Sequence, residues 1–548
     1  MIEMKRIFLL GIILLAVILR FWQLQDVPPS MTWDEVAWGY NAYSLGIDGR
    51  DEFGKFLPLT YLESFGDFKP PLYAYLSVIP VKLFGLNEFS TRFASAFFGS
   101  LAIIVVYYLT IEILKKNPFT NVKSSSTIAL LTSAILAISP WHIMLSRAAF
   151  EANVASFFII LGVFAFLRSR SNIGWLFLSV ISFVLSMYTF NTARIVSPIL
   201  VVILFIVLRK HIFQNMLKSF FASLIGALIF LPLFFFLLTP QASLRYHEVN
   251  IFSDTSLVER ANQMINNDNN AVWSKMIHNR RFVYTLEYLK HYFDNLSPQF
   301  LFIKGDGNPK FSIQDVGQLY IWEIPFIIVG ILFLIRKKEG MWFLVPILIL
   351  VGIIPAGIAR ETPHALRIES VLPAFQILSA YGLYYFVLKI KKKYFNVPLR
   401  ALTVMALAFV IFGSLVYFIH NYLRHYSNEY SREWQYGYKE AIKYVEKEGG
   451  NYDKVYFTES LGRPYIYALF YGKVSPLEFR KSALIDREVL GFVHVRSFGK
   501  YKFMDTFPLN PGDNALYIDQ TDNIPGGVHV LSEIKLLNGN SVLSVYTL

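Results

Sequence analysis

The chain has no cysteine and carries little charge. Its 548 residues include no Cys, and only 16% of them are Asp, Glu, Lys or Arg, against about a quarter in soluble domains. The absence of cysteine excludes disulfide bonds, thiol nucleophiles and thiolate metal sites. Any part of the chain outside the cytoplasm must therefore be held together by packing alone.

Apolar residues take the place of the missing charges. They make up 54% of the chain, and the mean hydropathy is +0.43. They fall in blocks of about 15–20 residues, the length that crosses a bilayer, at about 7–21, 92–114, 127–145, 151–167, 172–187, 195–208, 219–238, 321–335, 341–358, 368–388 and 401–420. The first block lacks a small-x-small cleavage site, so we interpret it as a retained helix. The blocks predict an all-α polytopic membrane protein with about 11 transmembrane helices.

The placement of the basic residues indicates the orientation of these helices. The formal net charge is +12, from 51 basic and 39 acidic residues. With the N-terminus inside, the inner loops hold 18 basic residues in about 50 positions, and the short outer loops hold 4 in about 28. This asymmetry follows the positive-inside rule. The basic balance is thereby explained without a nucleic-acid partner, and the protein is predicted to be multi-pass in the cell membrane.

Three long segments then lie outside the cytoplasm, at 22–91, 239–320 and 421–548. We therefore divide the chain into a transmembrane domain, 1–420, and a small extracytoplasmic C-terminal α/β domain. Within the first outer loop, the apolar run 72–86 is short and contains Pro and Lys, so it is typical of an interfacial helix.

The C-terminal domain shows its own local signals. Ser431 to Lys447 has helical periodicity, and Gly449-Gly450 marks the end of that helix. Lys454 to Thr458 is typical of a strand, and Pro464 to Tyr471 is an apolar helix or strand.

Acidic residues stand at the start of the first outer loop. Thr32 and Glu35 have the spacing of a capping box at a helix start. That leaves the carboxylate of Asp34 uncommitted in the first helical turn, where its ionised form is favoured and suits a general base. The alternative for Asp34 is a solvated loop carboxylate.

Cations stand at further predicted outer ends of helices. Lys69, before two prolines, can hold a phosphate as a point charge, or it can reach lipid headgroups. Arg147 and Glu151 are spaced as an i, i+4 pair, so a helix salt bridge is the simpler interpretation. The other polar positions on this face are Asn191, Arg194, His364 and Arg367. For His364 alone, a structural role is the simpler interpretation.

Carboxylates and cations on one face can move a group off an anionic leaving group, because the cations stabilise the departing phosphate and a carboxylate takes the acceptor's proton. The active site is therefore predicted to be extracytoplasmic. Aromatic residues, 17% of the chain, suit sugar stacking or membrane belts. No metal-binding cage stands out, and two adjacent acids leave a divalent cation open as a cofactor.

This constellation resembles the GT-C membrane glycosyltransferases, and more narrowly the relatives of protein O-mannosyltransferases and lipid A aminoarabinose transferases. The resemblance covers residues 1–420. It rests on Asp34-Glu35, on Lys69-Pro70-Pro71, on Ser146-Arg147 with Glu151, and on Pro363-His364-x-x-Arg367.

The resemblance implies a GT-C fold, a polyprenyl-phosphate sugar donor and an inverting reaction. It implies catalytic roles for Asp34, as base, and for Glu35. Contacts to the donor phosphate or sugar would come from Lys69, Arg147, Glu151, Asn191, Arg194, His364 and Arg367. The acceptor hydroxyl would belong to a lipid, a glycan or a protein.

Two other classes compete with an enzyme. A transporter predicts inverted repeats, broken helices and mid-bilayer charges, whereas the sequence shows no repeat and few such charges. A non-catalytic membrane scaffold would keep the loops without the chemistry. A cavity that Asp34 shares with Lys69 and Arg194 would separate an enzyme from such a scaffold.

Overall fold

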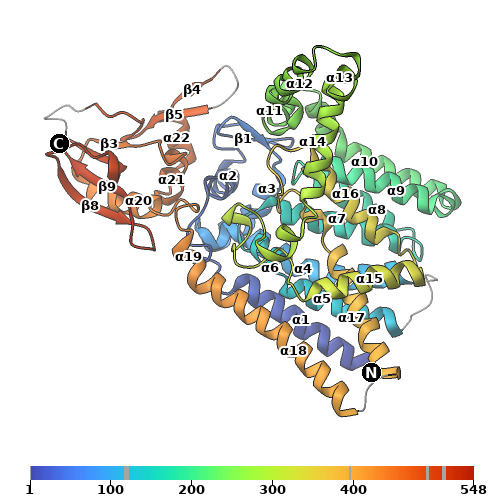
Figure 1. The fold of residues 1–548 in the computed structure, drawn as a ribbon. Helices are drawn as coiled ribbons and strands as arrows, with labels where there is room; N and C mark the ends of the chain where they lie inside the picture. Colours follow the sequence, from blue (N-terminus) through green and yellow to red (C-terminus); the bar gives the residue numbers. More distant parts are fainter. Residues whose placement is uncertain (1, 116–122, 394–396, 489–492, 509–513) are drawn as a thin grey trace. The chain divides into compact units, whose positions relative to one another are not determined.

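The computed structural model describes residues 2–115, 123–393, 397–488, 493–508 and 514–548 (Figure 1). They form two compact units, each assembled from separate stretches of the chain. The first unit includes Met1–Leu19, Phe98–Leu145 and Glu151–Phe418, and the second includes Arg20–Phe97, Ser146–Phe150 and Ile419–Leu548.

All eleven predicted apolar runs lie in helical structure. The helices are α1 (Ile2–Phe21), α4 (Glu88–Leu114), α5 (Lys123–Ile138), α6 (Pro140–Arg147), α7 (Glu151–Arg168), α8 (Trp175–Met187), α9 (Ala193–Gln214), α10 (Met216–Leu237), α15 (Glu323–Lys337), α16 (Leu344–Ile358), η4 (Glu369–Val371) with α17 (Ala374–Lys393), and α18 (Val397–His420). Six helices among the described residues are long and apolar enough to cross a membrane, and α5 with α6, bent by 55°, makes a seventh. The chain is therefore a multi-pass membrane protein. The number of about 11 spans stays a prediction, because α8, α15 and α16 have only 13, 15 and 15 residues and α1 is not among the helices that meet these criteria.

Glycines let the helices of the first unit approach closely. A Cβ atom placed on Gly382 of α17 would lie 1.8 Å from the Phe326 carbonyl oxygen of α15, and one on Gly330 would lie 2.1 Å from the Leu378 carbonyl oxygen. Membrane helices use small residues in this way because lipid gives them no hydrophobic drive to associate. The α15–α17 pair packs in turn on α5 through α17.

The segment between α10 and α15 forms further helices of the first unit. These are α11 (Pro240–Val249), η1 (Ile251–Ser253), α12 (Thr255–Asn267), α13 (Val272–Ile277), α14 (Arg280–Asp294), the π-helix η2 (Gln299–Ile303) and η3 (Pro309–Phe311). Helix α14 packs on α16. At its C-terminal end, the His291 Nδ1 lies 2.8 Å from the Ala359 carbonyl oxygen, and the Asn295 side chain donates to Thr362 Oγ1 at 3.1 Å.

The second unit begins with the first predicted outer loop. Its elements there are α2 (Trp33–Asp48), the antiparallel hairpin β1 (Leu62–Ser64) and β2 (Asp67–Lys69), and α3 (Leu72–Phe84). The predicted helix at 72–86 is α3, and its interfacial position stays a prediction.

The C-terminal residues add a seven-stranded sheet with short helices, as the α/β prediction expects. The elements are η5 (Asn421–His425), α19 (Tyr426–Glu429), α20 (Tyr438–Glu448), η6 (Gly449–Asn451), β3 (Lys454–Phe457), α21 (Pro464–Tyr471), α22 (Pro476–Ser482), β4 (Leu484–Arg487), β5 (Val493–Phe498), β6 (Tyr501–Phe503), β7 (Ala515–Gln520), η7 (Thr521–Asn523), β8 (His529–Lys535) and β9 (Ser541–Thr547). The strand order is β4-β5-β6-β3-β7-β9-β8, with β3 parallel to both its neighbours.

One boundary of the sequence prediction is wrong here. The helix expected from Ser431 begins only at Tyr438, because Gly437 has a φ of 113° and breaks the helical path before it. The predicted end at Gly449-Gly450 and the predicted strand at Lys454 are confirmed.

Helix α2 and the C-terminal elements share one hydrophobic core. Val36 and Tyr40 of α2 belong to the same buried cluster as Ile442 and Phe457. Across this core the Tyr467 hydroxyl donates to the Met31 carbonyl oxygen at 3.0 Å. The sequence predicted a separate C-terminal domain, and the structure adds residues 20–97 and 146–150 to it, because α2 buries most of its circumference.

Candidate functional site

Asp34 and Lys69 form an ion pair at the start of α2. The β1–β2 hairpin presents Lys69, whose ammonium lies 5.4 Å from the Trp38 ring centroid and 5.1 Å from that of Phe65. The side chain of Asp34 is 52% exposed, whereas that of Lys69 is 10% exposed. Two predicted site residues are thus brought together, with the carboxylate open to solvent and the ammonium held against aromatic faces.

Glu35 closes the predicted capping box. Its Oε2 accepts the Thr32 backbone N–H at 3.0 Å, and its own N–H donates to Thr32 Oγ1 at 3.3 Å. Its Oε1 accepts from Arg92 Nε at 3.0 Å and from the Ala149 N–H at 2.9 Å. The Glu35 carboxylate is fully buried and binds three donors, so its contacts are those of a group that fixes the start of α2.

Arg92 is a residue that the sequence reasoning missed. Its side chain is fully buried in α4 and donates to the backbone oxygens of Leu24 at 3.1 Å and Pro28 at 2.9 Å, and also to that of Ser30. It thereby fixes the loop that leads to Asp34. The available signal was a charge in the first turns of a predicted membrane helix, where charges are rare and functional.

Arg147 holds the same loop from a second side. Its Nη2 donates to the carbonyl oxygens of Gln23 at 3.2 Å and Val27 at 2.9 Å, and its guanidinium lies 5.5 Å from the Tyr422 ring centroid. Because α6 ends at Arg147 and α7 begins at Glu151, the i, i+4 helix geometry expected for this pair is wrong.

The remaining predicted site residues belong to the first unit. Arg194 Nε donates to the Met187 carbonyl oxygen at 3.2 Å, and its guanidinium lies 5.8 Å from the Phe236 ring. The Asn191 Oδ1 is buried and has no hydrogen-bond partner within the described ranges. Glu151 is the first residue of α7.

Glu369 is a second residue that was not selected from the sequence. It lies fully buried in η4, which packs against α7, and its backbone oxygen accepts from Ser156 Oγ at 3.3 Å. Neither of its carboxylate oxygens is hydrogen-bonded to any residue that the structure describes. Burying a carboxyl group without a hydrogen-bond partner costs folding free energy. Glu151 is among its charged neighbours.

His364 is buried in the turn before η4. Its ring packs on Phe311 with centroids 4.9 Å apart, and burial lowers the pKa of His364 to about 3, with the charge of Arg367 adding to the effect. Burial raises the pKa of nearby Asp306 to about 6, and that carboxylate accepts the Ala365 N–H at 2.7 Å. His364 is therefore neutral at pH 7, and its contacts order the turn.

Arg367 lies in the same turn. Its Nη2 is 3.5 Å from the Glu361 carboxylate, and its Nη1 donates to the Glu361 carbonyl oxygen at 3.1 Å. Both contacts of Arg367 go to Glu361, so they stabilise the turn between these two residues.

The predicted residues therefore divide between the two units. Asp34, Glu35, Lys69 and Arg147 belong to the second unit, and the other five belong to the first. A single cavity shared by all of them stays a prediction. No cluster of three or more His, Asp or Glu residues suited to a metal ion is found within the described part of the chain.

Comparisons with known proteins give a family match and several structural matches. Residues 11–245 match the family model described as dolichyl-phosphate-mannose-protein mannosyltransferase. The crystal structure of ArnT from Cupriavidus metallidurans bound to undecaprenyl phosphate is 14% identical, with 98% of this chain and 97% of that chain covered and a TM-score of 0.54. This chain has the fold of ArnT, and its residues 11–245 resemble the mannosyltransferase family.

Two further matches cover less of the chain. The oligosaccharyltransferase AglB from Archaeoglobus fulgidus, in complex with an inhibitory peptide and a dolichol-phosphate, is 14% identical with a TM-score of 0.50, covering 85% of this chain and 63% of AglB. An uncharacterized protein of Aquifex aeolicus (strain VF5) is 28% identical over 183 residues. That match covers 31% of this chain and about a third, 34%, of the Aquifex protein.

The family match covers only part of the candidate site. Residues 11–245 include the Asp34–Lys69 pair, Arg92 and Arg147 but end before His364. The two solved structures, at 14% identity, establish the fold and leave the substrates open.

Proposed function

We propose that this chain is a glycosyltransferase that moves a hexosyl or pentosyl group from a polyprenyl-phosphate sugar to a hydroxyl group of a lipid, glycan or protein acceptor, on the extracytoplasmic face and with inversion. The observation that carries the proposal is the ion pair between the half-exposed Asp34 carboxylate and Lys69. The nature of the donor is supported by the undecaprenyl phosphate bound to ArnT and the dolichol-phosphate in the AglB complex.

In the proposed step, Asp34 takes the proton of the acceptor hydroxyl. The acceptor oxygen forms a bond to the anomeric carbon as the bond from that carbon to the phosphate oxygen breaks, and the electron pair leaves on the polyprenyl phosphate. An alcohol is a poor nucleophile at neutral pH, so a base within hydrogen-bond reach is needed. Attack opposite the leaving group inverts the anomeric centre.

Lys69 is the cation that meets the leaving phosphate, assisted by Arg147 and Arg194. A phosphate that leaves as a stable anion needs positive charge more than a proton donor. Because the Lys69 ammonium is paired with the Asp34 carboxylate, a donor phosphate that reaches Lys69 competes for the ammonium. Donor binding thereby weakens the Lys69–Asp34 ion pair and frees the Asp34 carboxylate to accept the proton.

The other residues act on the sugar, the acceptor or the backbone. Glu151, Asn191 and Arg367 contact the sugar or the acceptor hydroxyl groups. Glu35 and His364 are positioning residues, because their contacts go to the α2 start and to the turn that carries Arg367. A divalent cation stays open as a cofactor.

The test is transfer of labelled sugar from its lipid phosphate, with donor binding measured in parallel. Asp34→Asn keeps the size but removes the base, so turnover should fall by about 10² to 10⁴ while donor binding is kept. Lys69→Ala should weaken donor binding as well as turnover. Asp26→Asn, an exposed acid of the same loop, is the matched control and should change neither. Near-normal turnover in Asp34→Asn would remove Asp34 as the base.

A further inference from the structure

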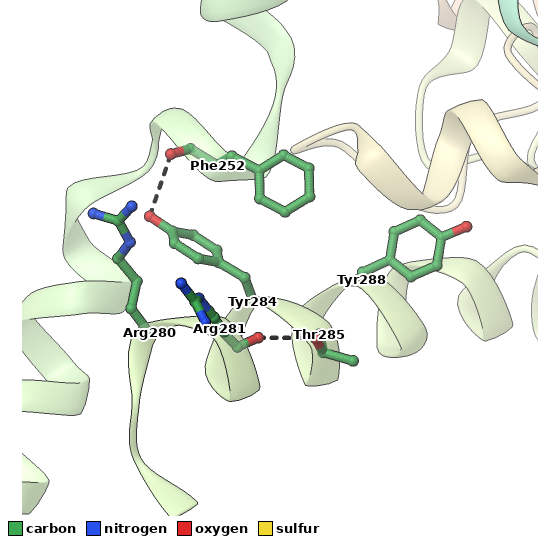
Figure 2. Close-up of a pocket in the computed structure, with 6 residues that line it drawn as sticks. All are labelled: Phe252, Arg280, Arg281, Tyr284, Thr285 and Tyr288. Carbon is green, nitrogen blue, oxygen red and sulfur yellow. Dashed lines mark hydrogen bonds between the residues drawn. The ribbon is translucent and has the colours of Figure 1, made fainter. Parts of the chain in front are cut away.

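A pocket of about 390 Å³ lies between η1 and α14, in the segment 239–320. It is lined by Phe252, Arg280, Arg281, Tyr284, Thr285 and Tyr288. Figure 2 shows the two guanidinium groups at one end and the rings of Phe252 and Tyr288 at the other, with Tyr284 between them. Its volume lies in the range of small-molecule sites.

The hydroxyl groups of Tyr284 and Thr285 are already hydrogen-bonded, whereas the two arginines of the pocket have no ion pair with any described residue. The Tyr284 hydroxyl donates to the carbonyl oxygen of Asp254 at 3.0 Å, and Thr285 Oγ1 donates to that of Arg281 at 2.8 Å. Within the described ranges, neither Arg280 nor Arg281 has an ion pair. Two adjacent guanidinium groups without a carboxylate repel each other, and a phosphate relieves that repulsion through paired N–H donors.

The opposite side of α14 is apolar and exposed. Phe282, Leu286, Leu289 and Phe293 recur at intervals of four and three residues, so they form one stripe along the helix. The neighbouring α13 exposes Val272, Trp273, Met276 and Ile277. These eight side chains are between 42% and 78% exposed, and together they form a larger apolar patch than a water-facing surface usually carries.

The course of α14 fits a helix that lies in the membrane surface. Helix α14 packs on α16, which in turn packs on α9, a helix with the length and composition of a membrane span. Helix α11 begins three residues after α10 ends, so this segment directly follows a helix with an exposed apolar surface. An amphipathic helix with aromatic residues on one face and basic residues beside it is the usual form of an interfacial helix.

We propose that this pocket binds the phosphate headgroup of an anionic phospholipid, with α13 and the α14 stripe lying in the bilayer interface. Arg280 and Arg281 hold the phosphate, and the aromatic end of the pocket covers the adjoining glycerol and first acyl carbons. The site is separate from the proposed transfer chemistry and does not depend on it.

The test uses the full chain in a neutral detergent, titrated with phosphatidylglycerol or with phosphatidylcholine, and bound lipid is read by native mass spectrometry. Arg280→Gln with Arg281→Gln should lower phosphatidylglycerol binding about thirtyfold, which corresponds to about 1 kcal/mol for each basic residue. The matched control, Lys275→Gln with Lys290→Gln, removes two charges from the same helices outside the pocket and should stay within about twofold. Equal losses in both pairs, or no loss in the first, would overturn the site.

Two further arms fix the source of the phosphate and the depth of the helices. Inorganic phosphate that displaces the lipid at low millimolar concentration would identify a site for free phosphate and overturn the lipid assignment. The fluorescence of Trp273 is the difference between the wild type and Trp273→Phe. In bilayers with brominated acyl chains this difference should be strongly quenched. Absence of that quenching would show that α13 lies outside the bilayer.

Discussion

Glu52 shows how burial can set the protonation of a single residue beside the candidate site. Its carboxyl is fully buried behind α2 and accepts from Ser64 Oγ at 2.9 Å, while its backbone N–H donates to Asn41. Burial raises the pKa of Glu52 to about 8. The folded protein therefore keeps this proton at neutral pH, although Lys69 lies close enough to act against the shift.

The shift predicts a pH dependence of stability. Because the pKa is about 4.5 in the unfolded chain and about 8 in the folded one, stability contributed by this group falls as pH rises from 4.5 to 8. The change is at most about 5 kcal/mol at about 1.4 kcal/mol per pKa unit. Glu52→Gln stays neutral and does not lose this stability. The Tm of the variant should therefore rise relative to that of the wild type from pH 5 to pH 8. A constant Tm difference across this range would contradict the prediction.

Glu35 and Arg92 form a buried pair whose members depend on each other. Glu35→Gln can keep part of the capping box but leaves the Arg92 guanidinium buried without its carboxylate. Removing one partner of such a pair typically destabilises by about 3–5 kcal/mol, so the Tm should fall sharply. Adding Arg92→Met should cost much less than the sum of the single changes. Strictly additive Tm losses would show that the pair is not coupled.

At the scale of the helices, α15 and α17 meet at glycines. Gly382→Leu must separate the two helices, because even a Cβ atom there would overlap the Phe326 carbonyl oxygen. We expect loss of several kcal/mol of stability and a poorly folded chain. Gly413→Leu in α18, where nothing lies within 4 Å of the added Cβ, is the control and should fold normally. The measurement is the monodisperse yield in detergent, and equal yields would contradict the role of Gly382.

The helices and the β1–β2 hairpin also show which features can be predicted from the sequence. Apolar runs and the Thr32–Glu35 capping box were predictable because each depends on neighbours a few residues away. Arg92 was missed because its partners are backbone oxygens of a loop whose path no local pattern reveals. Asp34 and Lys69 were selected for their chemistry, but their pairing depends on how α2 and the hairpin pack together.

At the scale of the whole molecule, the distribution of basic residues predicts the orientation in the membrane. The chain has no cysteine, so a single introduced Cys is a unique label. Lys338→Cys, in the exposed turn between α15 and α16, should react with an impermeant maleimide only after the cells are opened. Asn538→Cys, exposed between β8 and β9, should react in intact spheroplasts. The same pattern at both sites would contradict the predicted topology.

The shared core of α2 and the C-terminal elements has a consequence for how the protein is made. Tyr467 and Met31, which are hydrogen-bonded across this core, are 436 residues apart in the chain. At a synthesis rate of about 5–20 residues per second, the first loop waits roughly 20–90 s before the ribosome supplies its partner. During that time the apolar side chains of α2 must be shielded by the membrane or by a chaperone. A truncated product that stops before α21 would leave the loop of Asp34 without its packing partner, so the proposed base is fixed in place only when synthesis is nearly complete.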